Sequence, residues 1–563
     1  MVRRGIACVC LAAVLAVGPS ARAQSDEDPD SEETSEPLVG ETPRERADPP
    51  GDADDESPAE EGDDTIRLDD DLDDVGADVT FDADDENTDG EPIARTNVAR
   101  LDTKALAYGR MGVDMVHDET VTGADGIVEG REDTFYFRLH GRAEGTGRFG
   151  RRVKVKVAGR VDAEVSFDQE TEFGIQRYEA NIWDTYADVY GERFDLRFGN
   201  QLITWGYTDL LSPNDVINSR DLRRGPVVPV DELRIPVLAA KTTAYAGPFY
   251  LQGVWVPIAP TDRFELLDGD HAILGPNATS VVERRIGSIL KSLEGDPNLG
   301  ASLAPILAIG ERPDNGIETG EVGASLGLRT PAIDAATYIY YGHERAPRIR
   351  VAQELADVLQ MADPATLSPE AIGMELANLA MMGITPVEID HPRKLSLGAA
   401  VSARVEPVGL KLEGAYQPEA NTIVIPPGGG PLVGAAMALP QMTIAGGFDY
   451  ARGTELNVLI EAAYTRIFDV PAGLEVFRFD QDRLYTIGSR VAWSTGRGTF
   501  QLRFLGFVDV TSPSYAIKPA LRLSGHDHLS IEIAVGVYGG PANSLGGTQD
   551  RNDEVLLTVE YGL

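Results

Sequence analysis

Apolar and polar residues alternate with a period of two in long runs from about residue 104 to the end of the chain. Residues 153–167, for example, place valines on one face and charged residues on the other. Residues 134–144, 193–198 and 554–563 show the same pattern. Such alternation is typical of β-strands, whose successive side chains point to opposite faces. The runs last ~10 to 14 residues, which is longer than an ordinary strand and enough for a tilted strand to cross an outer membrane.

The connections between these runs alternate in length. Tight turns are expected at residues 145–150, 191–192, 247–248, 330–332, 406–408, 452–453, 495–498 and 524–527. Longer connections are expected at residues 119–132, 168–177, 205–235, 259–319, 346–393, 418–440, 467–483, 511–513 and 540–551. Short periplasmic turns and long outer loops alternate in this way in transmembrane barrels. We therefore predict an all-β fold, a transmembrane antiparallel up-and-down β-barrel of about 18 strands, with 16 as the alternative and both termini in the periplasm.

The beginning of the chain indicates secretion. Arg3 and Arg4 precede a short apolar stretch that ends at Ala21-Arg22-Ala23, the pattern of a signal peptide. Cys8 and Cys10 both fall in this segment, so we expect no disulfide or thiolate chemistry in the mature chain. The predicted domains are a signal peptide at residues 1–23, an acidic disordered periplasmic arm at 24–100 and an outer-membrane β-barrel at 101–563.

The acidity of the chain belongs mainly to one segment. Residues 26–91 contain 30 acidic and three basic residues, a charge of −27 out of the total of −41. So charged and so poorly apolar a segment is expected to stay disordered and to repel nucleic acid and anionic lipid. Asp85, Asn87 and Asp89 have the opening spacing of a calcium loop, but Thr96 replaces its final glutamate, so we interpret them as a solvated acidic tract. A periplasmic partner is the interaction considered for this arm.

One segment carries a family resemblance. Within residues 197–221, a strand ending in Gly-x-Gln is followed by Trp-Gly and by an Asn-x-x-Asp loop. The matching residues are Gly199, Gln201, Trp205, Gly206, Asn218 and Asp221. The segment resembles a proteobacterial family of large outer-membrane barrels of unknown function. Where that family has Asn-Pro before the last Asp, this chain has Ser219 and Arg220, so its loop path can differ. The resemblance implies an outer-membrane barrel that transports poorly soluble compounds.

The same segment has the composition of a loop that folds into the barrel lumen. Trp205 is expected at the outer end of its strand, where an indole suits the lipid interface. The other candidate loop residues are too polar to face lipid: Asp209, Asn214, Asp215, Asn218, Arg220, Asp221, Arg223 and Arg224. They are consistent either with a constriction loop or with a structural loop held by Asx turns and salt links.

Charged residues occupy the predicted lumen face of several strands. The candidates are Arg138, Arg142, Lys154, Lys156, Arg160, Arg193, Arg197, Glu455 and Glu461. The basic residues lie on early strands and the acidic residues on late ones. This separation would create a transverse field that orients solutes across the pore. The alternative is that the charges neutralise one another in a plugged lumen.

Two long outer connections are unusual for a sugar or ion porin. Residues 281–309 and 351–384 have the pattern of short amphipathic helices with exposed apolar faces. The apolar residues of the second are Leu355, Val358, Leu359, Met361, Met374, Leu376, Leu379, Met381 and Met382. Such faces require a partner. The helices could pack on one another as a lid, or they could collect a hydrophobic solute.

No catalytic motif is found. The seven histidines show no metal-binding or triad spacing, and we predict no enzyme activity and no cofactor or metal. The predicted function is passive transport of small hydrophobic or amphipathic solutes through the outer membrane of a Gram-negative bacterium. The alternatives are a general or ion-selective porin and a structural anchor or adhesin. The expected surroundings of the barrel are outer-membrane lipid and lipopolysaccharide.

Overall fold

The computed structural model describes residues 100–562 apart from several segments of the connections. The longer omitted segments are residues 115–120, 123–127, 130–134, 168–173, 295–319, 358–368 and 427–433, and shorter gaps occur in other connections. The predicted signal peptide, the acidic arm and the calcium-like spacing lie outside the described residues. None of the described helices is long and apolar enough to span a bilayer.

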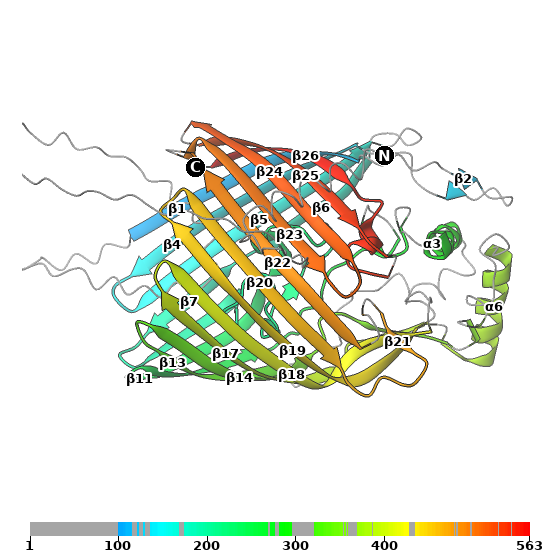
Figure 1. The fold of residues 1–563 in the computed structure, drawn as a ribbon, viewed down its shortest axis with the longest axis horizontal. Helices are drawn as coiled ribbons and strands as arrows, with labels where there is room; N and C mark the ends of the chain where they lie inside the picture. Colours follow the sequence, from blue (N-terminus) through cyan, green and yellow to red (C-terminus); the bar gives the residue numbers. More distant parts are fainter. Residues whose placement is uncertain are drawn as a thin grey trace, which may run out of the picture. The chain divides into compact units, whose positions relative to one another are not determined.

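Most of the described strands form one closed antiparallel barrel (Figure 1). Its strands are β1 (Arg100–Asp114), β4 (Phe135–Phe149), β5 (Val153–Phe167), β6 (Gly174–Ile182), β7 (Thr185–Tyr190), β8 (Phe194–Gln201), β11 (Val237–Ala246), β12 (Phe249–Val256), β13 (Glu321–Arg329), β14 (Ile333–His343), β17 (Arg393–Val405), β18 (Val408–Ile425), β19 (Ala435–Arg452), β20 (Leu456–Ile467), β22 (Arg483–Ser494), β23 (Phe500–Asp509), β24 (Ser514–His526), β25 (Leu529–Gly539) and β26 (Glu554–Gly562). Because β6 and β7 follow one another along β5, they make one crossing, and the barrel has the predicted 18 strands rather than 16.

The first and last strands close the ring. β1 pairs with β4 on one side and with β26 on the other, in a register that runs from Leu106 opposite Gly562 to Asp114 opposite Glu554. Neighbouring strands in the sheet are otherwise consecutive along the chain. Closure leaves no unpaired edge in the barrel sheet. Such an edge would be costly in lipid, which offers the backbone no hydrogen bonds.

The alternation of short turns and long connections is confirmed, with corrections to several of its boundaries. The first turn is tighter than expected, because pairing between β4 and β5 continues to Phe149 opposite Val153. The connection expected at residues 418–440 is mostly strand. β18 extends into it as far as Ile425 and β19 begins within it at Ala435, with a register shift between Gln417 and Ala420 that accommodates Pro418.

Short elements occur in the connections. They are β2 (Val121–Thr122), β3 (Val128–Glu129), β9 (Ser219–Arg220), α2 (Val230–Leu233), β10 (Arg234–Ile235), α3 (Val281–Glu294), β15 (Arg348–Val351), α6 (Pro369–Met382), β16 (Val387–Asp390), β21 (Glu475–Val476) and the 3₁₀ turn η4 (Gly547–Gln549). β21 pairs with the end of β18, and β9 pairs with β10 inside the connection from β8 to β11. α3 and α6 lie beyond one end of the strands (Figure 1).

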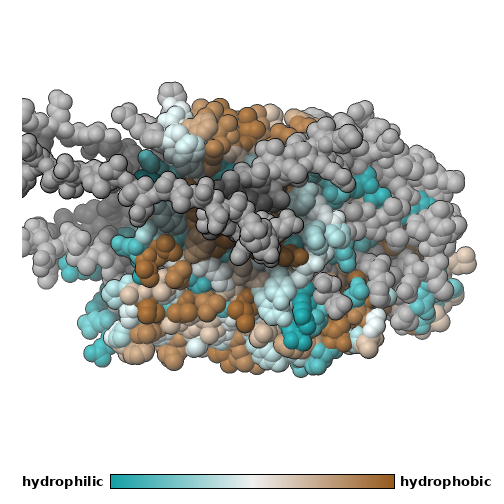
Figure 2. All heavy atoms as spheres, viewed as in Figure 1, coloured by the Kyte–Doolittle hydropathy of each residue, from teal (hydrophilic) through white to brown (hydrophobic). Residues whose placement is uncertain are grey.

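Apolar side chains cover the outer surface of the strands. Leu139, Val161, Leu326 and Ile444 are all exposed, whereas charged residues next to them in sequence, such as Arg138, are buried inside. Figure 2 shows hydrophobic residues gathered over the strand surface. A closed ladder with an apolar outer surface is the structure of a porin-like outer-membrane barrel, because lipid accepts apolar side chains but no unpaired backbone groups.

The two outer helices are confirmed within the described residues, and they pack on each other. Ile286 and Ile289 of α3 form a buried cluster with Leu376 and Leu379 of α6. Leu267, Leu274, Leu290, Leu355 and Ile372 complete the cluster. The apolar faces are therefore mutually covered, as in the lid alternative. Three methionines of α6 stay exposed, namely Met374, Met381 and Met382. Val358, Leu359 and Met361 lie outside the described residues.

Val161 tests the lipid-facing surface. It lies in the middle of β5 and is 43% exposed. Because Val161→Arg places a charge in hydrocarbon, we expect it to lower the free energy of unfolding in lipid vesicles by about 2 to 4 kcal/mol. Val161→Leu keeps the position apolar and should unfold at nearly the denaturant concentration of the native chain. An unfolding free energy that arginine leaves unchanged would contradict this placement.

Candidate functional site

The connection between β8 and β11, residues 202–236, folds into the barrel and is called the lumen loop below. At its start, Trp205 is 3% exposed and donates a hydrogen bond from Nε1 to Oε1 of Gln252 on β12, at 2.7 Å. The indole stacks on Tyr338, with ring centroids 5.3 Å apart, and meets Tyr340 edge-on. The expected position of Trp205 at the lipid interface is therefore wrong, because inner-wall partners on β12 and β14 hold the indole inside the barrel.

A carboxylate on the far wall holds the tip of the lumen loop. Glu461 of β20 is fully buried and accepts three backbone hydrogen bonds, from the N–H groups of Asp209, Leu210 and Leu211, at 2.7, 2.8 and 2.9 Å. β20 lies eight strands from β8 along the 18-stranded sheet, close to the opposite side of the ring. The lumen loop therefore spans the lumen.

β18 provides the second far-wall attachment. Glu413 accepts a hydrogen bond from Nδ2 of Asn214 at 2.9 Å and another from the hydroxyl of Thr208. On the same strand, Lys411 forms an ion pair with Asp209 at 2.6 Å. These contacts involve two of the predicted loop residues and two wall residues that the sequence analysis did not identify.

Polar contacts within the lumen loop fix its path. Asn218 is 3% exposed, and its amide donates to the carbonyl of Ile203 at 2.9 Å and accepts from the N–H of the same residue at 3.1 Å. Asp215 accepts a hydrogen bond from Asn218 and forms an ion pair with Arg234 at 2.7 Å. Asn218 thus ties its part of the loop back to Ile203 near the start of the loop.

The lumen loop also contacts the wall near the start of the chain. Glu232 of α2 forms ion pairs with Arg138 of β4, at 2.8 Å, and with Arg110 of β1, at 3.3 Å. Burial raises the pKa of Glu232, but the two guanidinium groups outweigh this effect and hold the pKa well below its usual range. Glu232 therefore stays ionised and ties the loop to this wall.

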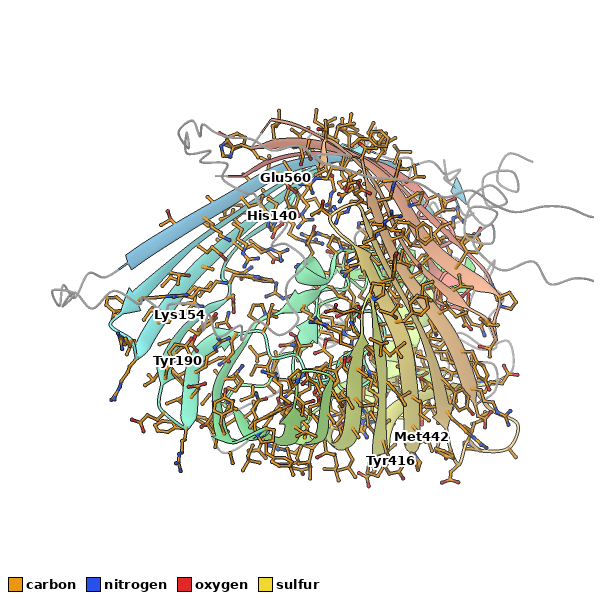
Figure 3. All side chains as sticks on the ribbon, turned by 60° about the vertical axis from the view of Figure 1, so that its left-hand side comes forward. His140, Lys154, Tyr190, Tyr416, Met442 and Glu560 are labelled. Carbon is orange, nitrogen blue, oxygen red and sulfur yellow. The ribbon has the colours of Figure 1, made fainter. Side chains whose placement is uncertain are left out.

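Asp162 of β5 is the centre of a buried basic cluster on the same wall. Arg138 and Arg160 each approach its carboxylate to 2.6 Å, His140 Nδ1 lies at 3.0 Å, and Arg224 of the lumen loop lies at 3.4 Å. Figure 3 labels His140 and Lys154 on this wall, and Tyr416 and Met442 on the wall formed by β18 and β19.

The remaining predicted loop residues bind neighbouring connections. Arg223 pairs with Asp221 at 2.6 Å and also with Glu179 of β6. The backbone N–H of Arg220 donates to Asp262, at 2.7 Å, in the connection from β12 to β13. The lumen loop is thus attached to β6 and to the connection between β12 and β13.

The predicted lumen charges are mostly paired. Arg142 lies 3.0 Å from Glu144, Lys156 lies 2.9 Å from Asp184, and Arg197 lies 2.6 Å from Asp188. Lys154 lies on the same wall but has no hydrogen-bond or ion-pair partner among the described residues. Arg193 and Glu455 are exposed in short turns outside the strands, so they do not line the wall as expected. Both residues fall on the lumen side of the alternating pattern, but they lie just outside the ends of the strands.

Several residues of this site were not among the candidates of the sequence analysis: Arg110, Asp162, Glu232, Lys411 and Glu413. Asp162 and Glu413 were detectable, because both are charged residues on the lumen side of an alternating run. Glu232 lies in a short helix of an irregular connection, where no periodic signal marks it. The lumen loop and the barrel walls together bring side chains of opposite charge and apolar side chains close to one another in the lumen.

Glu461 provides a direct test of the lumen loop. Glu461→Ala removes the acceptor of three N–H groups, each worth about 1.5 to 3 kcal/mol when the acceptor is charged. We expect hydrogen exchange at the Asp209, Leu210 and Leu211 amides to accelerate at least about tenfold, and the single-channel conductance to rise. Glu455→Ala, the same change at an exposed turn residue, should alter neither quantity. Unchanged exchange in Glu461→Ala would contradict the anchoring role.

The comparisons with known proteins give a family and structural likenesses. Similar solved structures include Acinetobacter baumannii OccAB1 (8% identity, TM-score 0.44, 84% of this chain and 98% of that one) and Pseudomonas aeruginosa OpdL (9%, 0.41, 82% and 98%). The outer membrane channel DcaP of Acinetobacter baumannii is also similar (10%, 0.34, 83% and 97%). No curated protein matches. The model of a family described as "Protein of unknown function (DUF1302)" matches residues 6–561, and the chain therefore belongs to that family.

Proposed function

We propose that this outer-membrane barrel is a passive channel for small hydrophobic or amphipathic solutes, with the lumen loop as its constriction. The observation that carries the proposal is the attachment of one loop to opposite walls, to Glu413 of β18 on one side and, through Glu232 of the loop, to Arg138 of β4 on the other. A crossing segment divides a wide lumen into narrower paths. Solutes that pass it meet protein side chains rather than a broad column of water.

The side chains at the crossing support a solute with both apolar and polar parts. Ile203, Val216 and Ile217 of the lumen loop are buried against the inner wall. Val227 packs on Ala516 and Tyr538 of the strands near the end of the chain. Apolar contacts therefore alternate with ion pairs along the loop. Mostly apolar surroundings with a few fixed polar groups are the usual composition of a small-molecule site.

The outer lid supports the same proposal. α3 and α6, joined by their apolar cluster, lie at the end of the barrel that carries the long connections. Met374 and Met381 are exposed on α6. Methionine side chains adapt to ligands of varied shape. A lid of this kind suits a hydrophobic or amphipathic solute better than a sugar or an ion.

A structural anchor is the second candidate. The observation that favours it is the same set of ties between loop and wall, since a segment held by Glu413, Glu461 and Glu232 would also hold a closed barrel. Conductance separates the two functions, because an anchor needs no path through the lumen.

A planar-bilayer experiment tests the channel. The purified full chain should produce stepwise conductance, and the neutral amphipathic solute hexanamide should reduce the current because it occupies the constriction. Glycerol at the same molarity serves as the polar control and should change the current only through viscosity. Absence of current in the native chain and in Glu461→Ala would favour the anchor. A current that hexanamide leaves unaltered would favour a general or ion-selective porin.

Leu379 tests the contribution of the lid. It is fully buried between α6 and α3, so Leu379→Ala leaves a cavity that costs about 2 to 5 kcal/mol of local packing. We expect faster hydrogen exchange in α6, a retained conductance and a weaker effect of hexanamide. Met381→Ala, a truncation of a 79% exposed residue on the same helix, is the matched control and should preserve the native behaviour. If α6 loosens but hexanamide acts as before, the lid has no part in the solute path.

A further inference from the structure

The basic cluster around Asp162 contains more positive than negative charge. Four guanidinium groups gather there, from Arg110, Arg138, Arg160 and Arg224. Among the described residues, two carboxylates, Asp162 and Glu232, form ion pairs with them. His140 contacts Asp162 as well and can add no negative charge. The cluster therefore has a surplus of two positive charges in a largely buried place, which is costly unless an anion is nearby.

The neighbouring charges offset one of these two positive charges. Arg177, Arg223 and Arg263 pair with four carboxylates. These are Glu164, Glu179, Asp221 and Glu265, and Asp221 also interacts electrostatically with Arg224 of the cluster. Lys518 also lies near Arg110 and Glu232, with Glu554 as a further carboxylate close by. Lys518 and Glu554 cancel each other, and Glu532, which also lies near Lys518, pairs with Arg503, so the surplus among the described residues is one positive charge.

The surplus can be located at specific nitrogen atoms. Nε of Arg224 is buried and has no hydrogen-bond partner among the described residues, and its Nη2 reaches Asp162 only at 3.4 Å. Arg160 donates from Nε to Asp162, at 2.6 Å, and its terminal nitrogens have no partner in the part of the chain that the structure describes. The guanidinium of Arg160 also lies 4.4 Å over the ring of Trp183, which fixes its plane.

From this geometry we infer that Arg160 and Arg224 form a binding site for the carboxylate of a small organic acid. Each guanidinium presents a planar fork of N–H groups that matches the two oxygens of a carboxylate. One side of the site belongs to the wall and the other to the lumen loop, so a carboxylate bound there would lie at the constriction. The inference rests on the proposed function and specifies it. The amphipathic solute carries its polar end as a carboxylate.

Calorimetry on the purified full chain in detergent tests the site without any measurement of current. In a buffer that contains sodium chloride, hexanoate should bind and hexanamide, which has the same length but no charge, should bind at least about tenfold more weakly. Chloride is present throughout, so the measurement excludes a general counter-ion effect. Equal binding of the two probes, or binding of neither, would overturn the inference.

Variants then assign the binding to the two arginines. Arg160→Gln and Arg224→Gln should each weaken hexanoate binding about tenfold, since each removes a charge-assisted contact. Arg522→Gln is the matched control, because it removes one guanidinium, on β24, whose ion-pair partner is Glu560 of β26. It should keep the native affinity. If Arg160→Gln fails to fold, as judged by heat-modifiable migration, Arg160→Lys keeps the charge without the fork and should bind with reduced affinity.

The outcome separates this inference from the proposed function. A chain that conducts and responds to hexanamide but does not prefer hexanoate would remain a channel without the carboxylate site. A chain that binds hexanoate through Arg160 and Arg224 without conducting would keep the site but lose the channel. Native affinity in both glutamine variants would overturn the site even if hexanoate binds elsewhere.

Discussion

The closed ring of backbone hydrogen bonds is the constraint on which the rest of the structure depends. Lipid offers no hydrogen bonds, so every strand must pair on both sides, and the pairing of β1 with β26 satisfies the last two edges. In a closed ring, the alternating side chains can point only toward the lipid or toward the lumen. Apolar residues such as Leu139 face outward, and their polar neighbours must face inward. The charged interior is thus a direct consequence of the membrane-facing exterior.

Charges in such an interior need partners, and the lumen loop supplies many of them. Glu232 neutralises part of the excess on β1 and β4, while Glu461 and Glu413 of the far wall are satisfied by loop N–H, hydroxyl and amide groups. Wall and loop therefore stabilise each other. The transverse field across the pore stays a prediction. Most charges neutralise one another locally, but the β4 and β5 wall keeps a positive excess.

The sequence was sufficient for the strands and for the faces of their side chains. Arg138 and Glu461 were placed inside because alternation depends only on local spacing. The position of a residue along the barrel axis is harder to predict from the sequence. Arg193 and Glu455 fall on the lumen side of the alternating pattern, as expected, but they lie in turns. Trp205 was misplaced because its partner, Gln252, belongs to a strand 47 residues away. No local pattern encodes which wall a loop reaches, so the far-wall contacts of Asp209 could not be anticipated.

The length of these contacts along the chain bears on how the barrel is assembled. The N–H of Asp209 meets a carboxylate 252 residues later, and Arg110 donates to Thr558, 448 residues later. Contacts of such high sequence separation form slowly, because long stretches of chain must be ordered before they are made. The lumen loop therefore gains its anchor only when the C-terminal half is in place. Insertion of the later strands and capture of the loop are coupled, and the barrel is completed around its own internal segment.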